Sequence, residues 1–429
     1  MSHVAESGAR PRAALREFAI GYRLLEPRFR REGRAALLVS CIVVAVYCFI
    51  ALHGGLGRTV QIEHIDLNVY RAGARMLLDG GDLYGRLPPV APGLELPFTY
   101  PPIAAVLLVP LAVLPAALDG LISIAVTAIL LAVVTRQVLR ALGVRPGALL
   151  DGAVIVAMPA ALILDPVRVA LSDGQIDVVL MALVVADTLG GGVRIGRFRA
   201  RGVLVGLAAA VKLTPAVFML YFLARGQRRA AGTAAASFTA FSALGALVAP
   251  RDSVEYWGHD ILQTGRIGSV WYAANQSLDA VLARTGLSGR GLECVWLVSC
   301  ALVVALAWVI MRRAAIDANP VGVLFINALA ELLISPISWT HHWVWIAPML
   351  VALGTAGRED GLHAMRALGA IGFVVFAIGP QWLLPHSGDR ELHWALWEQV
   401  LGGCYVWFAI SILTICALPR LLLTSRRTR

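Results

Sequence analysis

Long apolar runs recur along most of this 429-residue chain, and they restrict its fold more than any other feature. Many of them have the length that an α-helix needs to cross the hydrocarbon core of a bilayer, at least about 17 residues. Only 15% of the residues are charged, and the mean hydropathy is +0.74. The sequence therefore predicts an all-α polytopic membrane protein without a separate soluble domain.

The basic residues indicate the orientation of the chain in the membrane. They lie in short runs between apolar segments, as is typical of cytoplasmic loops. Residues 1–34 carry eight arginines against four glutamates and are predicted to lie in the cytoplasm. The formal net charge of +10 does not indicate nucleic-acid binding, because no stretch interleaves basic and aromatic residues on a soluble domain.

Ten apolar segments are predicted to cross the membrane. They lie at 35–52, 117–141, 149–164, 176–190, 230–249, 291–311, 320–336, 343–356, 366–384 and 395–418. The chain then divides into a cytoplasmic segment (1–34), a transmembrane domain (35–418) and a cytoplasmic tail (419–429). External loops are expected at about 53–116, 165–175, 250–290, 337–342 and 385–394.

Residues 101–115 are predicted to form a re-entrant or interfacial helix on the outer face. The segment contains four prolines, which disfavour a continuous helix. If it crossed the membrane as well as 117–141, the arginines that follow would lie outside, against the charge rule. A single crossing by 117–141 is therefore expected.

The run at 202–224 is predicted to form a broken hairpin, because it is basic at both ends. Residues 202–211 would rise partway, Lys212 and Pro215 would mark the break, and 216–224 would descend. These two half-helices bring the expected number of membrane segments to twelve, with both termini in the cytoplasm. Lys212 would then lie at membrane depth.

Uncommon polar groups gather on the outer side of this topology. An ionisable group near hydrocarbon is costly unless it is paired or hydrated, so such a cluster is a candidate functional site. Its members are Asp66, Tyr100, Asp173, Gln175, Asn275, Gln276, His341 and His342, and Lys212 would reach toward them from the tip of the hairpin.

Asp66 has two interpretations. It precedes a run in which Leu67, Tyr70 and Ala74 share one helical face, so it could serve as the N-cap of an amphipathic helix. A carboxylate at a boundary between water and lipid could also act as a general base that takes a proton from a hydroxyl. Both interpretations stay open on the sequence.

Lys212, the only lysine, also has two interpretations. Its side chain could extend to the membrane interface, or it could bind an anionic partner such as a phosphate. His341 and His342 are neighbours whose side chains point about 100° apart on a helix, so they are not expected to chelate one metal. Neither a metal site nor a cofactor is predicted.

The polar motifs follow a definite order along residues 60 to 350. They are IDLNVYRAG with Asp66, YPP with Tyr100, DGQID, a K-x-x-P hairpin, NQS and SPISWTHH. This order resembles the membrane-embedded C-type glycosyltransferases of family 87, which include actinobacterial polyprenol-phosphate-mannose-dependent α-1,2-mannosyltransferases. The resemblance implies the C-type glycosyltransferase fold in the plasma membrane, with the active site on the external side.

The resemblance also implies the reaction and the roles of individual residues. The donor would be a β-linked polyprenyl-phosphate mannose, and the acceptor a mannose hydroxyl on a phosphatidylinositol mannoside or a lipomannan-type glycolipid. Asp66 matches the essential external aspartate and would be the general base of an inverting transfer. The donor phosphate would bind Lys212, His341 and His342, with Lys212 and a protonated histidine stabilising its charge. The other members of the cluster would contact substrate.

The sequence lacks the usual D-x-D-like acidic pair, and this affects the prediction of metal binding. Asp66 is followed by Leu67 and Asn68, so no D-x-D pair is formed. This lowers the expectation of a metal-dependent site.

Other functions fit the same sequence less well. A lipid flippase or secondary transporter also has many spans and broken helices, but related halves are expected there and no internal repeat is visible. A glycosyltransferase that uses another polyprenyl-phosphate sugar, such as arabinofuranose, is a further alternative. A nonenzymatic assembly partner would tolerate asparagine in place of Asp66.

Overall fold

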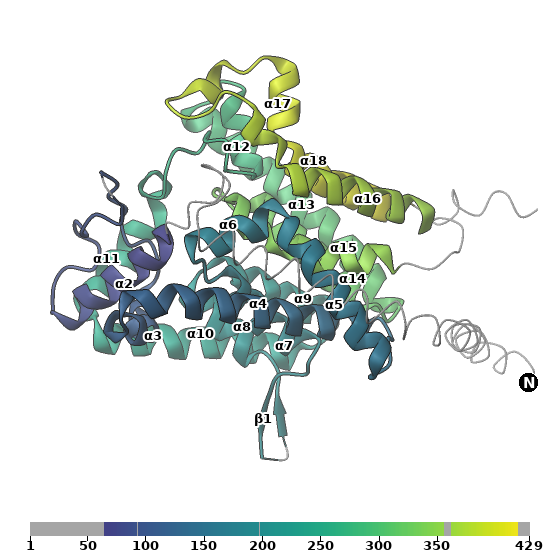
Figure 1. The fold of residues 1–429 in the computed structure, drawn as a ribbon, viewed down its shortest axis with the longest axis horizontal. Coiled ribbons are helices and arrows are strands. Elements are labelled where there is room, and N and C mark those ends of the chain that lie inside the picture. The colour runs from purple at the N-terminus through teal and green to yellow at the C-terminus, as the bar shows by residue number, and fades with distance from the viewer. Residues whose placement is uncertain (1–63, 92, 197, 356–361, 419–429) are drawn as a thin grey trace, which may run out of the picture.

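Helices form most of the structure, a computed structural model that describes residues 64–91, 93–196, 198–355 and 362–418 (Figure 1). The predicted cytoplasmic segment 1–34, the first span 35–52 and the tail 419–429 lie outside the described residues. The apolar helices lie alongside one another; in Figure 1 the shorter helices α2 and α11 lie at the left of the molecule, and α12 and α17 lie at its top.

Three helices are long and apolar enough to cross a membrane unaided, namely α4 (Ala116–Ala141), α10 (Arg228–Val248) and α13 (Gly289–Ile316). The other predicted spans among the described residues fall on shorter helices: α5 (Ala148–Ile163), α7 (Asp177–Thr188), α14 (Pro320–Ile334), α15 (Ile346–Gly354), α16 (Leu362–Ile378) and α18 (Cys404–Ala417). The chain is a helical membrane protein. The total of twelve membrane segments stays a prediction, because helix length and composition alone do not fix it.

The predicted span at 395–418 is broken in the structure. The chain forms two helices there, α17 (Leu396–Gly402) and α18, which are bent by 71° relative to each other. The Trp394 ring packs so closely on Gly402 that a Cβ there would lie 2.1 Å from Trp394 Cζ3. The apolar pattern does not reveal this contact beside the break.

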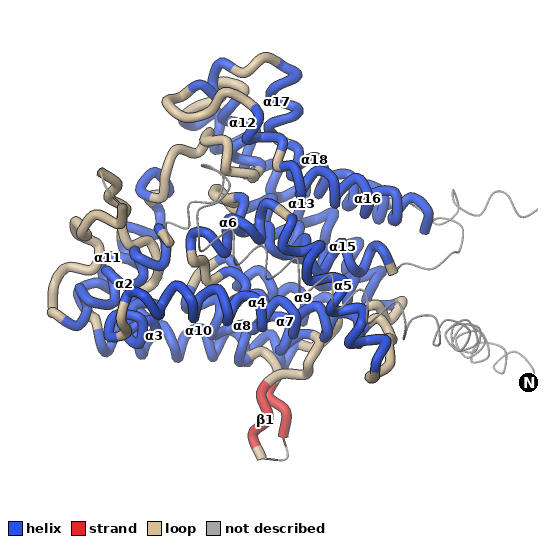
Figure 2. Tube along the Cα trace, viewed as in Figure 1, coloured by secondary structure: helices blue, strands red, loops and turns tan. Residues whose placement is uncertain are grey.

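A short β-hairpin departs from the all-α prediction. The basic loop after α7 forms β1 (Val193–Ile195) and β2 (Phe198–Ala200), shown in red in Figure 2. Gly196 has a φ of 57° in the turn between the strands, a conformation that glycine adopts without strain. Within the described residues these two strands form the only sheet.

The predicted external loops contain the helices α2 (Ile65–Leu78), α3 (Pro102–Val113), α6 (Asp165–Asp173), α11 (Pro250–Gly258) and α12 (Leu278–Arg284). Short 3₁₀ helices connect them to the bundle: η2 (Asp260–Leu262), η3 (Thr264–Arg266), η4 (Thr340–Trp345), η5 (Pro380–Leu383) and η6 (Arg390–His393). Among them, α2, α6 and η4 carry members of the predicted polar cluster.

The predicted amphipathic helix is α2. Leu67, Tyr70 and Ala74 are buried on its inner face, whereas Leu78 at its end is 54% exposed. Arg71 ties the helix to α4 by an ion pair with the buried carboxylate of Asp119. These contacts fix the position of Asp66 at the start of the helix.

The predicted segment at 101–115 contains α3, which packs against α2 and α10. The chain then becomes extended at Leu114 and Pro115 before α4 begins. The predicted separation of this segment from the span at 117–141 is therefore confirmed. Its re-entrant or interfacial position stays a prediction.

The predicted broken hairpin is confirmed. Helix α8 (Val203–Val211) ends before Lys212, whose backbone is extended, and the chain continues as η1 (Thr214–Phe218) and α9 (Met219–Ala224). An Arg201 guanidinium nitrogen lies 3.3 Å from Gln227 Oε1, so the two ends of the hairpin meet. Lys212 is at its tip.

Close packing of α8 against α10 holds this hairpin, and substitution of Gly206 tests it. A Cβ at Gly206 would lie 2.3 Å from the Ala234 carbonyl oxygen, whereas a Cβ at Gly232 would meet nothing within 4 Å. We expect Gly206→Ala to destabilise the protein by about 1–3 kcal/mol relative to Gly232→Ala, because overpacking forces the two helices apart. Thermal unfolding of the two purified variants measures this difference, and equal midpoints would contradict the packing.

Candidate active site

Asp66 is the second residue of α2 and not its cap. The N-cap position is occupied by His64, and no side-chain cap hydrogen bond is formed there. The amide of Gln175 instead donates a hydrogen bond to the Asp66 carboxylate. Burial raises the pKa of Asp66 to about 6, although the hydrogen bond from Gln175 and the positive charge of Lys212 act in the opposite direction. The interpretation of Asp66 as a helix cap is therefore wrong.

A chain of side-chain contacts leads from Asp66 into the protein. The Tyr70 hydroxyl donates to Gln175 Oε1 at 2.7 Å and lies 3.0 Å from the Tyr100 hydroxyl. The Tyr100 ring in turn lies 5.8 Å from the Lys212 ammonium. The structure thus brings Asp66, Tyr100, Gln175 and Lys212 together, as the sequence predicted, and adds Tyr70 to them.

Lys212 is held by two side chains from other elements. Its Nζ donates to Asp177 Oδ1 at 2.7 Å and lies 3.0 Å from His342 Nε2. Only 13% of the lysine side chain is exposed, so the ammonium does not extend to the surface. The interpretation of Lys212 as a side chain that reaches the interface is not supported, and its charge is directed into the cluster.

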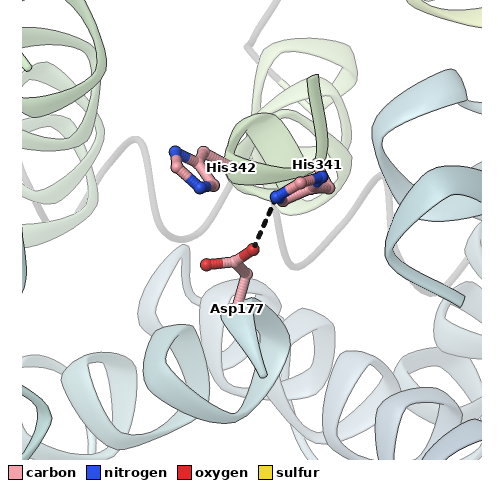
Figure 3. Close-up of side chains that lie close together, drawn as sticks. All are labelled: Asp177, His341 and His342. Carbon is pink, nitrogen blue, oxygen red and sulfur yellow. Dashed lines mark ion pairs between the residues drawn. The ribbon is translucent and has the colours of Figure 1, made fainter. Parts of the chain in front are cut away.

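His341 and His342 lie on η4 and face the same acidic residue (Figure 3). His341 Nε2 lies 3.9 Å from Asp177 Oδ2, and its Nδ1 lies 4.0 Å from Asp173 Oδ2. Burial lowers the pKa of His341 to about 4 and that of His342 well below its usual value. Both rings are therefore neutral near pH 7. The expected protonated histidine is not supported, which leaves Lys212 as the cation of this cluster.

Two acidic residues of the site were not predicted. Asp177 ends the DGQID motif, and its two carboxylate oxygens face Lys212 and His341. Glu331 is buried in the apolar helix α14 and lines a cavity of about 20 Å³ together with Asp177, Thr214 and His342. That volume can hold one water molecule. An acidic residue inside an apolar helix is itself a signal of function, and it could have identified Glu331.

The same cluster has the spacing of a metal site. Ligand atoms of Asp177, His341 and His342 lie within 4.8 Å of one another, although the two histidines were not expected to share an ion. Lys212 Nζ, however, is within hydrogen-bond distance of two of these three residues. A divalent ion would have to displace the ammonium or tolerate its repulsion, so the arrangement favours a site in which Lys212 supplies the positive charge.

Asn275 and Gln276 lie in a different environment. Both are fully buried, and their amide groups donate to backbone carbonyls, those of Val270 and Pro336 for Asn275 and those of Ala273 and Gly402 for Gln276. Asn275 Oδ1 also accepts from the Ser338 backbone. The contacts of Asn275 fasten the predicted external loop to the segment before η4. The predicted contact of the two residues with substrate stays a prediction.

The sequence of the chain matches one family of known proteins. A family model described as glycosyltransferase family 87 matches residues 98–336, more than half of the chain. No solved structure matches the chain.

Curated relatives match over most of their length. A polyprenol-phosphate-mannose-dependent α-(1-2)-phosphatidylinositol mannoside mannosyltransferase of Mycolicibacterium smegmatis is 37% identical over 92% of this chain and 94% of its own. The protein of the same name from Mycobacterium tuberculosis is 37% identical over 85% of this chain and 86% of its own. A phosphatidylinositol pentamannoside mannosyltransferase of Mycobacterium tuberculosis is 34% identical over 82% of this chain and 80% of its own.

Proposed function

The chain belongs to glycosyltransferase family 87, and from this membership we propose that it transfers mannose from polyprenyl-phosphate mannose to a mannose hydroxyl of a phosphatidylinositol mannoside, forming an α-1,2 linkage. The names of the relatives supply the donor, the acceptor class and the linkage. A lipomannan-type glycolipid offers the same kind of hydroxyl as an alternative acceptor.

One observation carries the proposed chemistry: a carboxylate and a buried cation share one polar cluster but come from different elements. Asp66 lies on α2, whereas Lys212 lies at the tip of the α8–α9 hairpin beside η4. The side chains of Gln175, Tyr70 and Tyr100 connect the two. A glycosyl phosphate bound in this cluster would have the Asp66 carboxylate on one side, as a base for the acceptor hydroxyl, and the positive charge of Lys212 on the other.

The proposed reaction is a single in-line displacement. The acceptor hydroxyl oxygen attacks the anomeric carbon and gives its proton to Asp66, while the bond from that carbon to the phosphate oxygen breaks. The polyprenyl phosphate leaves with the bonding electron pair, and Lys212 stabilises its negative charge. The neutral ring of His341 can donate a hydrogen bond to the phosphate without adding charge. The two nitrogens of His342 already face Lys212 and the Ile337 backbone, so a direct contact of His342 with the phosphate would replace one of these partners. No cofactor takes part in these steps.

The other residues of the cluster have proposed binding roles. Tyr100 and Gln175 adjoin Asp66, and Asp173 faces His341, so each is placed to contact a sugar hydroxyl. Asn275 and Gln276 keep the expected substrate-binding role only as a proposal, because the contacts of their amides are with the backbone.

The proposed setting is the plasma membrane, with the site on the external side. Twelve membrane segments with both termini in the cytoplasm satisfy the distribution of basic residues. Both substrates are lipids, so a site beside the outer leaflet can receive them without extracting either from the bilayer.

An assay with purified protein separates this proposal from the transporter alternative. The protein is reconstituted with polyprenyl-phosphate mannose and a phosphatidylinositol mannoside, and the lipids are analysed by mass spectrometry. We expect an acceptor enlarged by one mannose. A parallel reaction with polyprenyl-phosphate arabinofuranose tests the other donor. Movement of donor lipid across the bilayer without a new glycosidic bond would contradict the proposal.

The pH dependence of transfer tests the role of Asp66. Its pKa of about 6 means that the carboxyl must lose its proton before it can act as a base. We expect the rate to rise with pH through about 6, and to fall to roughly a tenth of its plateau at one pH unit below the pKa. A profile between pH 5 and 7 that is flat, after correction for protein stability, would contradict this assignment.

A further inference from the structure

A groove of about 380 Å³ lies between α5, α15 and α16, outside the cluster around Lys212. Each helix contributes four lining residues with the spacing i, i+3, i+4 and i+7, at 157–164, 347–354 and 366–373. This spacing selects one face of each helix, and each stripe is about 10 Å long at 1.5 Å per residue. The groove is therefore elongated along the helices, a shape that suits a chain more than a compact ring.

The lining is suited to hydrocarbon. Alanine and glycine make up seven of the twelve lining residues, and Arg366 is the only charged one. Small side chains leave space between helices, and the volume falls within the range of about 300–1,000 Å³ that is usual for small-ligand sites. No carboxylate or amide lines the groove, so it is not built to bind a sugar.

One end of the groove adjoins the candidate active site. Ala347, which lines this end, follows His342 by five residues along η4 and α15. Leu164 lines the same end and directly precedes α6, which packs against η4 and ends at Asp173 opposite His341. This end of the groove is therefore next to the elements that carry His342 and Asp173.

The groove and the helix that carries the proposed base lie on different sides of the molecule (Figure 1). Figure 1 places α2, which carries Asp66, on the left of the molecule, whereas α5, α15 and α16 lie on the right. In an in-line displacement the leaving group departs from the face opposite the attacking hydroxyl. The groove is thus on the side where the leaving phosphate and whatever is attached to it should lie.

From these observations we propose that the groove between α5, α15 and α16 binds the polyprenyl chain of the donor. This identification of the chain rests on the proposed function. The acyl chains of the acceptor then lie on the side of α2, and the two lipids do not compete for one groove.

Bulky substitutions in the groove test the proposal. Ala160→Phe and Ala370→Phe place rings in it, and Ala125→Phe on the exposed face of α4 is the matched control. Each variant is assayed with a full-length donor and with a donor shortened to one isoprene unit, which is too short to reach the substituted positions. We expect the KM for the full-length donor to rise about tenfold in the two groove variants, the loss expected when two methylene-sized groups are no longer buried. The KM for the short donor, and both KM values of the control, should stay unchanged.

A second measurement does not require turnover. A donor analogue with a photoreactive group on the third isoprene unit from the phosphate is irradiated with the wild-type protein, and the labelled peptides are identified. Labelling of α5, α15 or α16 supports the proposal. Labelling elsewhere, or equal losses for the long and short donors, would overturn it. If wild-type protein transfers mannose from neither donor, the proposed function fails, and the labelling still decides what the groove binds.

Discussion

Replacing Lys212 by methionine is expected to lower mannose transfer by about 10²–10³-fold, the loss typical when a preorganised group that stabilises transition-state charge is removed. Methionine keeps the length and apolar stem of the side chain but removes the positive charge from Asp177 and His342. The leaving phosphate then develops its charge without a cation. Initial rates at saturating donor and acceptor measure the effect, and Arg229→Met at an exposed site is the control.

A double variant separates catalysis from folding. Lys212→Met leaves the buried carboxylate of Asp177 without its ion-pair partner, which destabilises a protein by several kcal/mol, about 3–5. Adding Asp177→Asn removes that unpaired charge, so thermal stability should recover while activity stays low. If the double variant regains the wild-type rate, Lys212 serves only to neutralise Asp177, and its assignment to the donor phosphate is wrong.

Replacing Asp66 by asparagine is expected to lower the rate by about 10²–10⁴-fold, the usual contribution of a general base. Asparagine is nearly the same size and can keep a hydrogen bond with Gln175, so the protein should fold and bind donor normally. The loss should therefore affect kcat much more than KM for the donor. Asp79→Asn, at the exposed C-terminal end of the same helix, should have wild-type kinetics.

Retention of the wild-type rate by Asp66→Asn would have a clear meaning. It would remove the base from the mechanism and would agree with a nonenzymatic assembly partner. A rise in KM for the donor with unchanged kcat would instead make Asp66 a binding residue.

The sequence predicted features that depend on local chemistry. Apolar length identified the helices that follow residue 117, and the proline after Lys212 together with basic residues at both ends predicted the broken hairpin. The polar motifs were assigned to one side of the membrane, and the structure does bring Asp66, Tyr100, Gln175 and Lys212 together. For the helices and the hairpin, the signal lies within a few residues of the feature.

Features that depend on tertiary contacts were missed. The α17–α18 bend lies beside a close contact of the Trp394 ring with Gly402. The role of Asp177 depends on which face of α7 meets Lys212 and η4. Asn275 resembles a ligand-binding residue in sequence, yet its amide fastens one backbone segment to another. Polar residues that bind a ligand and polar residues that fasten the backbone cannot be distinguished before the fold is known.

The proposed mechanism is a single displacement, with Asp66 as the base and Lys212 beside the leaving phosphate. The anomeric configuration of the product tests this most directly, because a single displacement inverts the reacting carbon. The measurement uses a synthetic donor of defined β configuration and determines the new linkage by nuclear magnetic resonance. An α-linked mannose is the predicted result. A β-linked product would require two displacements through a covalent intermediate and would contradict the account.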